Sequence, residues 1–245
     1  MPNNHSRLLL LLIALVLLLS ACSVNISPGG SSTSSTATPG ASNAQAHGNT
    51  APDSGTFDGC PARGDGGDPQ LNLLKNRTDT ATWSPIAFSE MINWTWPHSV
   101  EKRDMASWSQ ADANAVAQHN GTPVSLTGYV ALARREGPES PNCHSQIDRD
   151  FHIWIVDHST TDRSHSIITE ATPRVRAHHS GWTIDNLFRI SRNQLQVRMS
   201  GWSMLDQEHP EQLNQTRGTL WEIHPIMQIE VQQNGSWVPL DSAQL

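Results

Sequence analysis

The stretch TLWEIHPIMQIEV (residues 219–231) alternates apolar and polar side chains, a pattern typical of a β-strand with one buried face. Glu222 and His224 lie two residues apart on the other face, and Pro225 interrupts the run. Because proline has no N–H to donate, we expect the strand to bulge or to run as an edge there. The apolar face that we expect inside the protein comprises Trp221, Ile223, Met227 and Ile229.

Four earlier stretches also read as strands, and a helical stretch falls between the third and the fourth. In chain order these are residues 122–136, 149–158, 165–174, the helix at 180–193, and 195–206. With residues 219–231 as the fifth strand, the order is β-β-β-α-β-β, as in the OB-fold, a five-stranded Greek-key barrel. The sequence therefore predicts a mainly β protein with an OB-like barrel over residues 122–245. A different small barrel is the alternative.

Residues 59–121 read differently, with Gly- and Asp-rich loops and short helical segments. Residues 84–94 and 104–121 both have the pattern of short helices, and Gly121 follows the second. About 60 residues bury too little surface to be trusted as an independent domain. We therefore expect a helical and loop subregion that packs on the barrel.

The first 21 residues have the pattern of an export signal, with Arg7 before an uncharged run from Leu8 to Leu19. That run is too short for a comfortable bilayer span. It ends in Leu19-Ser20-Ala21-Cys22, which resembles the lipobox of bacterial lipoproteins. The resemblance implies cleavage before Cys22, lipid such as palmitate on its thiol, and a membrane-anchored protein of the cell envelope that faces outside the cytoplasm. An ordinary secretory signal is the alternative.

Residues 22–58 are rich in Ser, Thr, Gly, Ala, Pro and Asn and have almost no large apolar side chain. Such a composition cannot bury enough surface to offset chain entropy, so we expect a disordered tether between the lipid and the folded part. Apart from Cys22, the cysteines are Cys60 and Cys143. In an oxidising envelope these two allow one pairing, and we expect a disulfide.

The whole chain has 16 basic and 23 acidic residues, a formal net charge of −7 with histidine neutral. Bulk nucleic-acid binding needs a basic surface, so this balance disfavours it. The expected partners are the membrane, through the lipid anchor, and a ligand or envelope partner that the sequence does not identify.

Four segments together resemble a bacterial group of exported OB-like proteins. The resemblance covers most of residues 60–240, and it implies an OB-like fold and export. It transfers no activity and no catalytic residue to this chain. The segments are GDGGDPQLNLLKNR (residues 64–77), DFHIWIVD (150–157), TPRVRAHHSGW (172–182) and TRGTLWEIHPIMQIEV (216–231).

The side chains that should point away from the barrel interior combine tryptophan rings with charged groups. OB-folds bind ligands on the outer face of their second and third strands and at the flanking loops. Flat rings beside charged groups suit a sugar ring or a base. The candidate ligand-binding residues are His152, Trp154, Glu170, Arg198, Trp202, Glu222 and His224.

Three interpretations of this cluster stay open. The first is a binding module for a saccharide, a nucleic acid or a protein. The second is a metal-dependent hydrolase in which the two imidazoles and a carboxylate hold the ion. The third is a structural His–Glu network that pins the strands under the N-terminal subregion.

The metal interpretation meets two objections. No short signature such as HExxH accompanies the cluster. If the fifth strand pairs with the first, His152 and His224 would also lie too far apart to share an ion. The sequence therefore predicts no cofactor and keeps a divalent metal only as an alternative.

Overall fold

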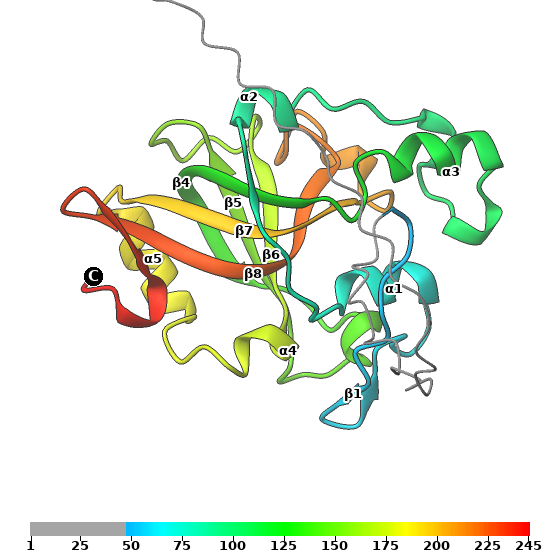
Figure 1. Cartoon of the computed structure of the whole chain (residues 1–245), viewed down its shortest axis with the longest axis horizontal. Coiled ribbons are helices and arrows are strands. Elements are labelled where there is room, and N and C mark those ends of the chain that lie inside the picture. Colours follow the sequence, from blue (N-terminus) through cyan, green and yellow to red (C-terminus); the bar gives the residue numbers. More distant parts are fainter. Residues whose placement is uncertain (1–47) are drawn as a thin grey trace, which may run out of the picture. The chain divides into compact units, whose positions relative to one another are not determined.

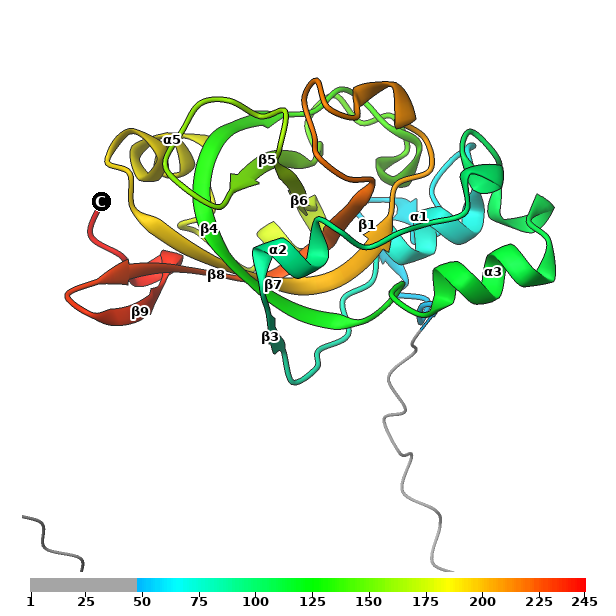
Figure 2. The same ribbon diagram turned by 90° about the horizontal axis from the view of Figure 1, so that it is seen from above.

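Five strands close into a barrel in the computed structural model, which describes residues 48–245. They are β4 (Pro123–Arg135), β5 (Phe151–Val156), β6 (Ile167–Ala171), β7 (Gln196–Leu205) and β8 (Trp221–Gln233). All neighbouring strands pair antiparallel except β6 and β8, which pair in parallel. The circuit β4-β5-β6-β8-β7 is completed by the β4–β7 pairing, and the long, curved β4 is seen in Figure 2.

The helix between the third and fourth strands of the barrel is α5 (Ile184–Arg192), which follows the short α4 (Pro173–Arg176). Its N-terminus is capped by Thr183, whose hydroxyl accepts a hydrogen bond from the Asn186 N–H. Leu187 and Ile190 are buried, and α5 packs against β4. The observed order β-β-β-α-β-β and the barrel closure confirm the predicted OB-like fold.

One pairing differs from the sequence-based expectation and bears directly on the site. The fifth strand, β8, pairs with the third and fourth strands, β6 and β7. The first strand, β4, pairs with the fourth strand, β7, and not with β8. The outer faces of β5, β6 and β8 are therefore neighbours. This order removes the separation that we expected between His152 and His224.

The predicted irregularity at Pro225 is confirmed as a bulge between β7 and β8. Their register shifts on both sides of Gly201, and a Cβ at Gly201 would lie 2.2 Å from the Pro225 carbonyl oxygen. Only glycine allows this close approach of the two backbones. The shift also changes which side chain is buried: Ile226 belongs to the core, and Met227, predicted there, is only partly buried.

The barrel interior is apolar, as the alternation predicts. Trp221, Ile223 and Ile229 of β8 are buried in one large core cluster. Phe151, Ile153 and Ile155 of β5 lie in the same core cluster, so the side chains between them point away from the barrel interior.

The N-terminal subregion contributes short elements that lie against the barrel. Figure 1 shows α1 and α3 at one end of the barrel and α5 at the opposite end. Residues 84–94, predicted as one helix, instead form a strand that pairs in parallel with β4, followed by a single helical turn. The elements are β1 (Thr56–Phe57), β2 (Cys60–Pro61), α1 (Pro69–Lys75), β3 (Ser84–Ile86), α2 (Phe88–Met91) and α3 (Gln110–Ala117).

Short 3₁₀ turns and one last strand complete the described chain. The strand β9 (Ser236–Pro239) pairs with the C-terminal part of β8. The 3₁₀ turns are η1 (His98–Val100), η2 (Met105–Ser107), η3 (Ser140–Asn142), η4 (Pro210–Gln212) and η5 (Leu240–Ser242).

The end of the expected tether differs from the prediction. Residues 48–58 contact the folded part: the Gly48 N–H donates to the Asn120 carbonyl, and the Ser54 hydroxyl donates to the Asn76 carbonyl. Backbone-directed hydrogen bonds hold this polar segment, and they do not show in an apolar pattern. The signal region 1–21, Cys22 and the rest of the tether lie outside the described residues.

The predicted disulfide is present between Cys60 and Cys143, whose Cα atoms lie 5.7 Å apart. It joins the N-terminal subregion to the loop between β4 and β5. Within residues 48–245, none of the helices has the length and apolar character needed to span a bilayer.

Candidate functional site

An ionic cluster lies on the outer face of β5, β6 and β8. His152 of β5 stands directly opposite Glu170 of β6 in the ladder, and Glu222 of β8 is paired with Ile168 of β6. Because alternate residues share a face, His224 lies beside Glu222 on the same side of β8. We define the ionic cluster as Glu136, Asp150, His152, Glu170, Asp206, Arg217, Glu222 and His224.

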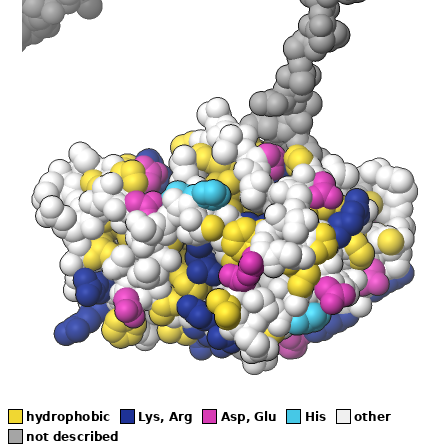
Figure 3. All heavy atoms as spheres, turned by 90° about the horizontal axis from the view of Figure 1, so that it is seen from below, with side chains coloured by type: hydrophobic (Ala, Val, Ile, Leu, Met, Phe, Trp, Pro, Cys, Tyr) yellow, Lys and Arg dark blue, Asp and Glu magenta, His cyan; other side chains and the backbone are white. Residues whose placement is uncertain are grey.

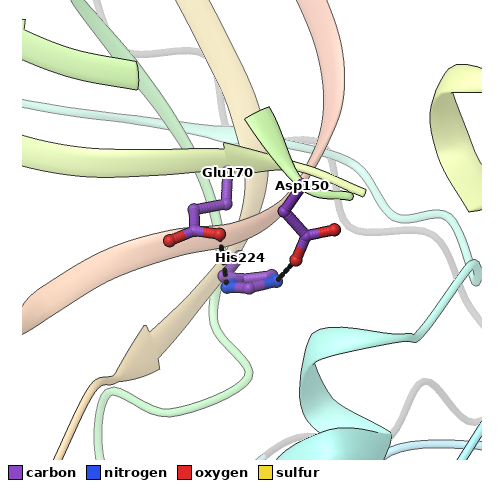
Figure 4. A group of neighbouring side chains, drawn as sticks. All are labelled: Asp150, Glu170 and His224. Atoms are coloured by element: carbon purple, nitrogen blue, oxygen red, sulfur yellow. Dashed lines mark ion pairs between the residues drawn. The ribbon is translucent and has the colours of Figure 1, made fainter. Parts of the chain in front are cut away.

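The His224 imidazole lies between carboxyl groups. Its Nε2 is 3.5 Å from Asp150 Oδ2, and its Nδ1 is 3.8 Å from Glu170 Oε2. Figure 4 shows the ring between these two side chains. Nδ1 also contacts Glu222 Oε1 at 3.2 Å. Strands β6 and β8 and the residue just before β5 thus place three carboxyl groups around one imidazole.

The His152 imidazole and the Arg217 guanidinium are paired with their own carboxylates. His152 Nδ1 lies 3.1 Å from Glu136 Oε1 and 3.0 Å from Glu170 Oε1. One Arg217 nitrogen donates to Asp206 Oδ2 at 2.6 Å. Glu170 therefore lies between the two histidines of the cluster.

The charges of the cluster shift its pKa values in a consistent way. Burial disfavours protonation of both imidazoles, yet the Glu170 carboxylate and further carboxyl contacts raise the pKa of His224 to about 10 and that of His152 to about 9. Burial opposes ionisation of Glu170, but both histidines together lower its pKa to about 2. Burial and the Asp206 charge raise the pKa of Glu222. Glu170 is therefore ionised and both imidazoles are protonated at neutral pH.

The cluster is buried, which corrects the expectation of a solvent-facing site. Glu222 and His224 are each 1% exposed, His152 is 6% exposed and Glu170 is 7% exposed. Their direction away from the barrel interior is as predicted. The subregion covers this face, because α1 packs against both β8 and η3. Their part in ligand binding stays a prediction.

The two predicted tryptophan platforms are buried as well. The Trp154 indole N–H donates to the Thr216 carbonyl at 2.6 Å, and the ring lies 4.1 Å from the His152 ring. Trp202 is fully buried, with the Arg77 guanidinium 3.4 Å from its ring centroid. Neither ring presents a free face of the kind that a stacked sugar or base requires.

Arg198 is not part of the ionic cluster. Its guanidinium forms two hydrogen bonds with the Glu230 carboxylate, at 2.6 and 2.7 Å, and lies over the Trp237 ring. The structure thus brings together four of the predicted residues, His152, Glu170, Glu222 and His224, and places Trp154 beside them. It leaves Arg198 and Trp202 elsewhere.

Several members of the ionic cluster were missed in the sequence. Asp150 could have been found, because it precedes His152 by two residues and so shares its face. Glu136, Asp206 and Arg217 come from the loops between β4 and β5 (residues 136–150) and between β7 and β8 (residues 206–220). No local pattern shows which strand a loop residue will approach.

A pocket opens between these same two loops. Its volume is about 310 Å³. Lys75 and Glu139 belong to its lining, and both border the ionic cluster: Glu139 senses the charges of Glu170 and Asp150, and Lys75 those of Asp206 and Glu222. We call this the interloop pocket, lined by Lys75, Pro138, Glu139, Ser140, Pro141, His144, Glu208 and His209.

Two acidic residues of the interloop pocket differ in their electrostatic surroundings. The Glu208 carboxylate is paired with Lys75 Nζ at 2.9 Å. Burial and the neighbouring Glu170 charge raise the pKa of Glu139 to about 8. At neutral pH the Glu139 carboxyl is therefore mostly protonated and can both donate and accept a hydrogen bond.

The protein surface carries charges of both signs. On the face drawn in Figure 3, basic and acidic side chains are interspersed. A field of one sign, which attracts polyanions from a distance, requires segregated charges. This face does not have that segregation.

Comparisons with known proteins give distant structural similarity to OB-fold proteins. A protein described as an aspartyl-tRNA synthetase from Leishmania major Friedlin is 10% identical; the match covers 65% of this chain and 23% of that one, with a TM-score of 0.32. An OBody, AM1L10, bound to hen egg-white lysozyme is 17% identical over 48% of this chain and 85% of its own, with a TM-score of 0.25. No protein-family model and no curated protein matches the chain. The fold assignment therefore depends on the strand topology itself.

Proposed function

We propose that this protein is a lipid-anchored protein of the cell envelope whose OB barrel binds a small polar ligand, such as a saccharide unit, in the interloop pocket. The position of that pocket carries the proposal. OB-folds bind ligands beside the loops that join their first to second and fourth to fifth strands. The interloop pocket lies between these two loops, and its volume of about 310 Å³ is at the small end of ligand sites.

The lining favours a ligand rich in hydroxyl groups. Glu139 offers a carboxyl group that can donate and accept, Ser140 offers a hydroxyl, and Glu208 offers carboxyl oxygens. Tryptophan, which would favour a stacked base, does not belong to the lining. The membrane location is supported by the lipobox-like Leu19–Cys22 sequence.

The test is a ligand screen on purified full-length protein in detergent. Neutral sugars, amino sugars, short peptides and oligo-deoxythymidine are compared by the rise in melting temperature, because a ligand that binds only the folded state stabilises it. A sugar should raise the melting temperature, and Glu139→Gln and Glu208→Gln should each weaken its binding at least tenfold.

The matched control is His179→Gln. His179 lines a different pocket of about 240 Å³, where its Nδ1 contacts Asp241. This variant should bind the sugar as the wild type does. If oligo-deoxythymidine or a peptide raises the melting temperature and the sugars do not, the ligand of the interloop pocket is a nucleic acid or a peptide and not a saccharide. Binding that survives both glutamate substitutions would place the ligand elsewhere and overturn the proposal.

A further inference from the structure

Asp150, Glu170 and His224 present potential metal-ligating atoms to one another. One ring nitrogen of His224 and one carboxylate oxygen from each of the other two lie within 4.8 Å of one another. All three side chains are more than nine-tenths buried. Three different segments supply them: Asp150 directly precedes β5, Glu170 belongs to β6, and His224 belongs to β8.

These atoms converge without making hydrogen bonds. Asp150 Oδ2, Glu170 Oε2 and His224 Nε2 are buried and have no hydrogen-bond partner. Asp150 Oδ2 lies 3.5 Å from His224 Nε2, and Glu170 Oε2 lies 3.8 Å from the other ring nitrogen, Nδ1; both distances are longer than a hydrogen bond. Donor atoms that surround a tetrahedral Zn²⁺ ion lie about 3.4 Å apart, given bonds of about 2.1 Å. One ring nitrogen and one oxygen from each carboxyl group lie within 4.8 Å of one another, so small side-chain movements would bring all three onto one ion.

The balance of charge favours a cation at this place. Arg217 is paired with Asp206, and His152 is paired with Glu136. Asp150, Glu170 and Glu222 surround the His224 imidazole; Glu170 also contacts His152, and Glu222 lies 3.7 Å from Arg217. The ionic cluster as a whole has five carboxyl groups (Glu136, Asp150, Glu170, Asp206 and Glu222) and three basic side chains (His152, Arg217 and His224), so a cation would offset the excess of carboxyl groups.

The surroundings also orient the ligands. Glu222 Oε1 contacts His224 Nδ1 at 3.2 Å, which leaves Nε2 as the nitrogen that can face an ion. Asn142 Nδ2 donates to Asp150 Oδ1 at 3.0 Å. Partners of this kind are those that fix metal-binding histidines and carboxylates in proteins.

We propose that Asp150, Glu170 and His224 bind one divalent transition-metal ion, with Zn²⁺ as the ion that best fits one imidazole and two carboxylates. Imidazole nitrogen selects Zn²⁺ over Mg²⁺ and Ca²⁺, which prefer oxygen ligands alone. On binding, the ion takes the place of the imidazole proton, which leaves to solvent. The site borders the interloop pocket, but the assignment does not depend on a ligand in that pocket.

The test is calorimetric titration of Zn²⁺ into full-length protein that has been treated with a chelator and then freed of it. The expected stoichiometry is one ion per chain. Asp150→Asn and His224→Gln should each weaken binding at least tenfold, and Mg²⁺ should not compete. Asp150→Asn keeps an oxygen for Asn142, so this variant is the one expected to retain the fold, and its melting curve is recorded alongside.

The matched control is again His179→Gln, which breaks a His–Asp pair outside the cluster and should bind Zn²⁺ unchanged. The visible spectrum of Co²⁺-loaded wild type gives a second measurement that needs no variant, because a four-coordinate ion absorbs far more strongly than the hydrated one. No Zn²⁺ uptake up to about 1 mM would overturn the proposal. So would binding that survives both substitutions, or a Co²⁺ spectrum like that of the hydrated ion. None of these results bears on sugar binding.

Discussion

At the scale of single residues, His224 shows how burial changes the meaning of a polar motif. The Glu-x-His-Pro sequence breaks the apolar pattern of the fifth strand. On a strand that faces solvent, replacing its polar side chains would lower the free energy of unfolding only a little. Here the imidazole is 1% exposed and surrounded by carboxyl groups of Asp150, Glu170 and Glu222. Its loss removes the one basic group that all three carboxyl groups contact.

We therefore expect His224→Ala to lower the free energy of unfolding by about 3 to 5 kcal/mol, the usual cost of removing one partner from a buried ionic pair. Urea unfolding of chelator-treated protein measures this change. The control is His179→Ala, which removes a half-buried histidine paired with Asp241 and should cost about 1 kcal/mol or less. Equal, small effects in both variants would mean that the cluster adds little to stability.

Glu139 should make the stability depend on pH. Its pKa is about 8 in the folded protein and near 4.5 in the unfolded chain, so between these values the folded state holds a proton that the unfolded state has lost. Stability must then fall as pH rises from about 5 to 8. Glu139→Gln should remove this part of the decline, about 3 to 4 kcal/mol between pH 5 and 8.

Chemical unfolding of wild type and Glu139→Gln at pH 5, about 6.5 and 8 measures the difference. Glu90→Gln, a change at an exposed glutamate, is the control and should follow the wild-type curve. Identical slopes for Glu139→Gln and wild type would show that Glu139 ionises normally in the folded protein.

At the scale of elements, the strand alternation was enough to predict the barrel, because the interior of an OB barrel imposes a period of two on every strand. Pro225 also predicted an irregularity in β8, either a bulge or an edge, and the structure has the bulge, opposite Gly201 of β7. The burial of the outer face could not be predicted in this way. It depends on α1 and on the loop between β4 and β5, which lie about 70 to 150 residues before β8 in the chain, and such long-range contacts leave no local pattern.

The bulge supplies a prediction for one glycine. A Cβ at Gly201 would meet the Pro225 carbonyl oxygen at 2.2 Å, so Gly201→Ala should force β7 and β8 apart and lower the free energy of unfolding by about 1 to 3 kcal/mol. The control is Gly137→Ala, where an added Cβ meets no atom within 4 Å. Thermal unfolding compares the two. A neutral Gly201→Ala would show that the strands relax at no cost.

At the scale of the whole molecule, the disulfide ties the N-terminal subregion to the loop that lines the interloop pocket. Cys60 and Cys143 are 83 residues apart in the chain, so the cross-link closes a long loop. The chain-entropy account gives such a bond about 4 to 5 kcal/mol of stability. Cys60→Ser with Cys143→Ser should therefore lower the melting temperature strongly, as calorimetry can measure. An unchanged melting temperature would mean that non-covalent packing alone holds the subregion in place.

The proposed lipid anchor is tested at Cys22. Cys22→Ser should abolish lipid attachment and move the protein from the membrane fraction to the soluble fraction, because the acyl chains supply the membrane affinity. Mass spectrometry of the wild type should show the added lipid mass. Retention of Cys22→Ser in membranes, with an unchanged mass, would contradict the anchor.

The crowding of carboxyl groups around His224 also has a consequence for how this protein can evolve. Replacing one member of a buried ionic group is costly, whereas replacing the group together with well-packed apolar residues is often neutral or stabilising. Intermediate sequences with half of the group should therefore be rare. Among relatives of this chain, positions 150, 170, 222 and 224 should change together. A relative should have either all four ionisable residues or apolar residues at all four positions.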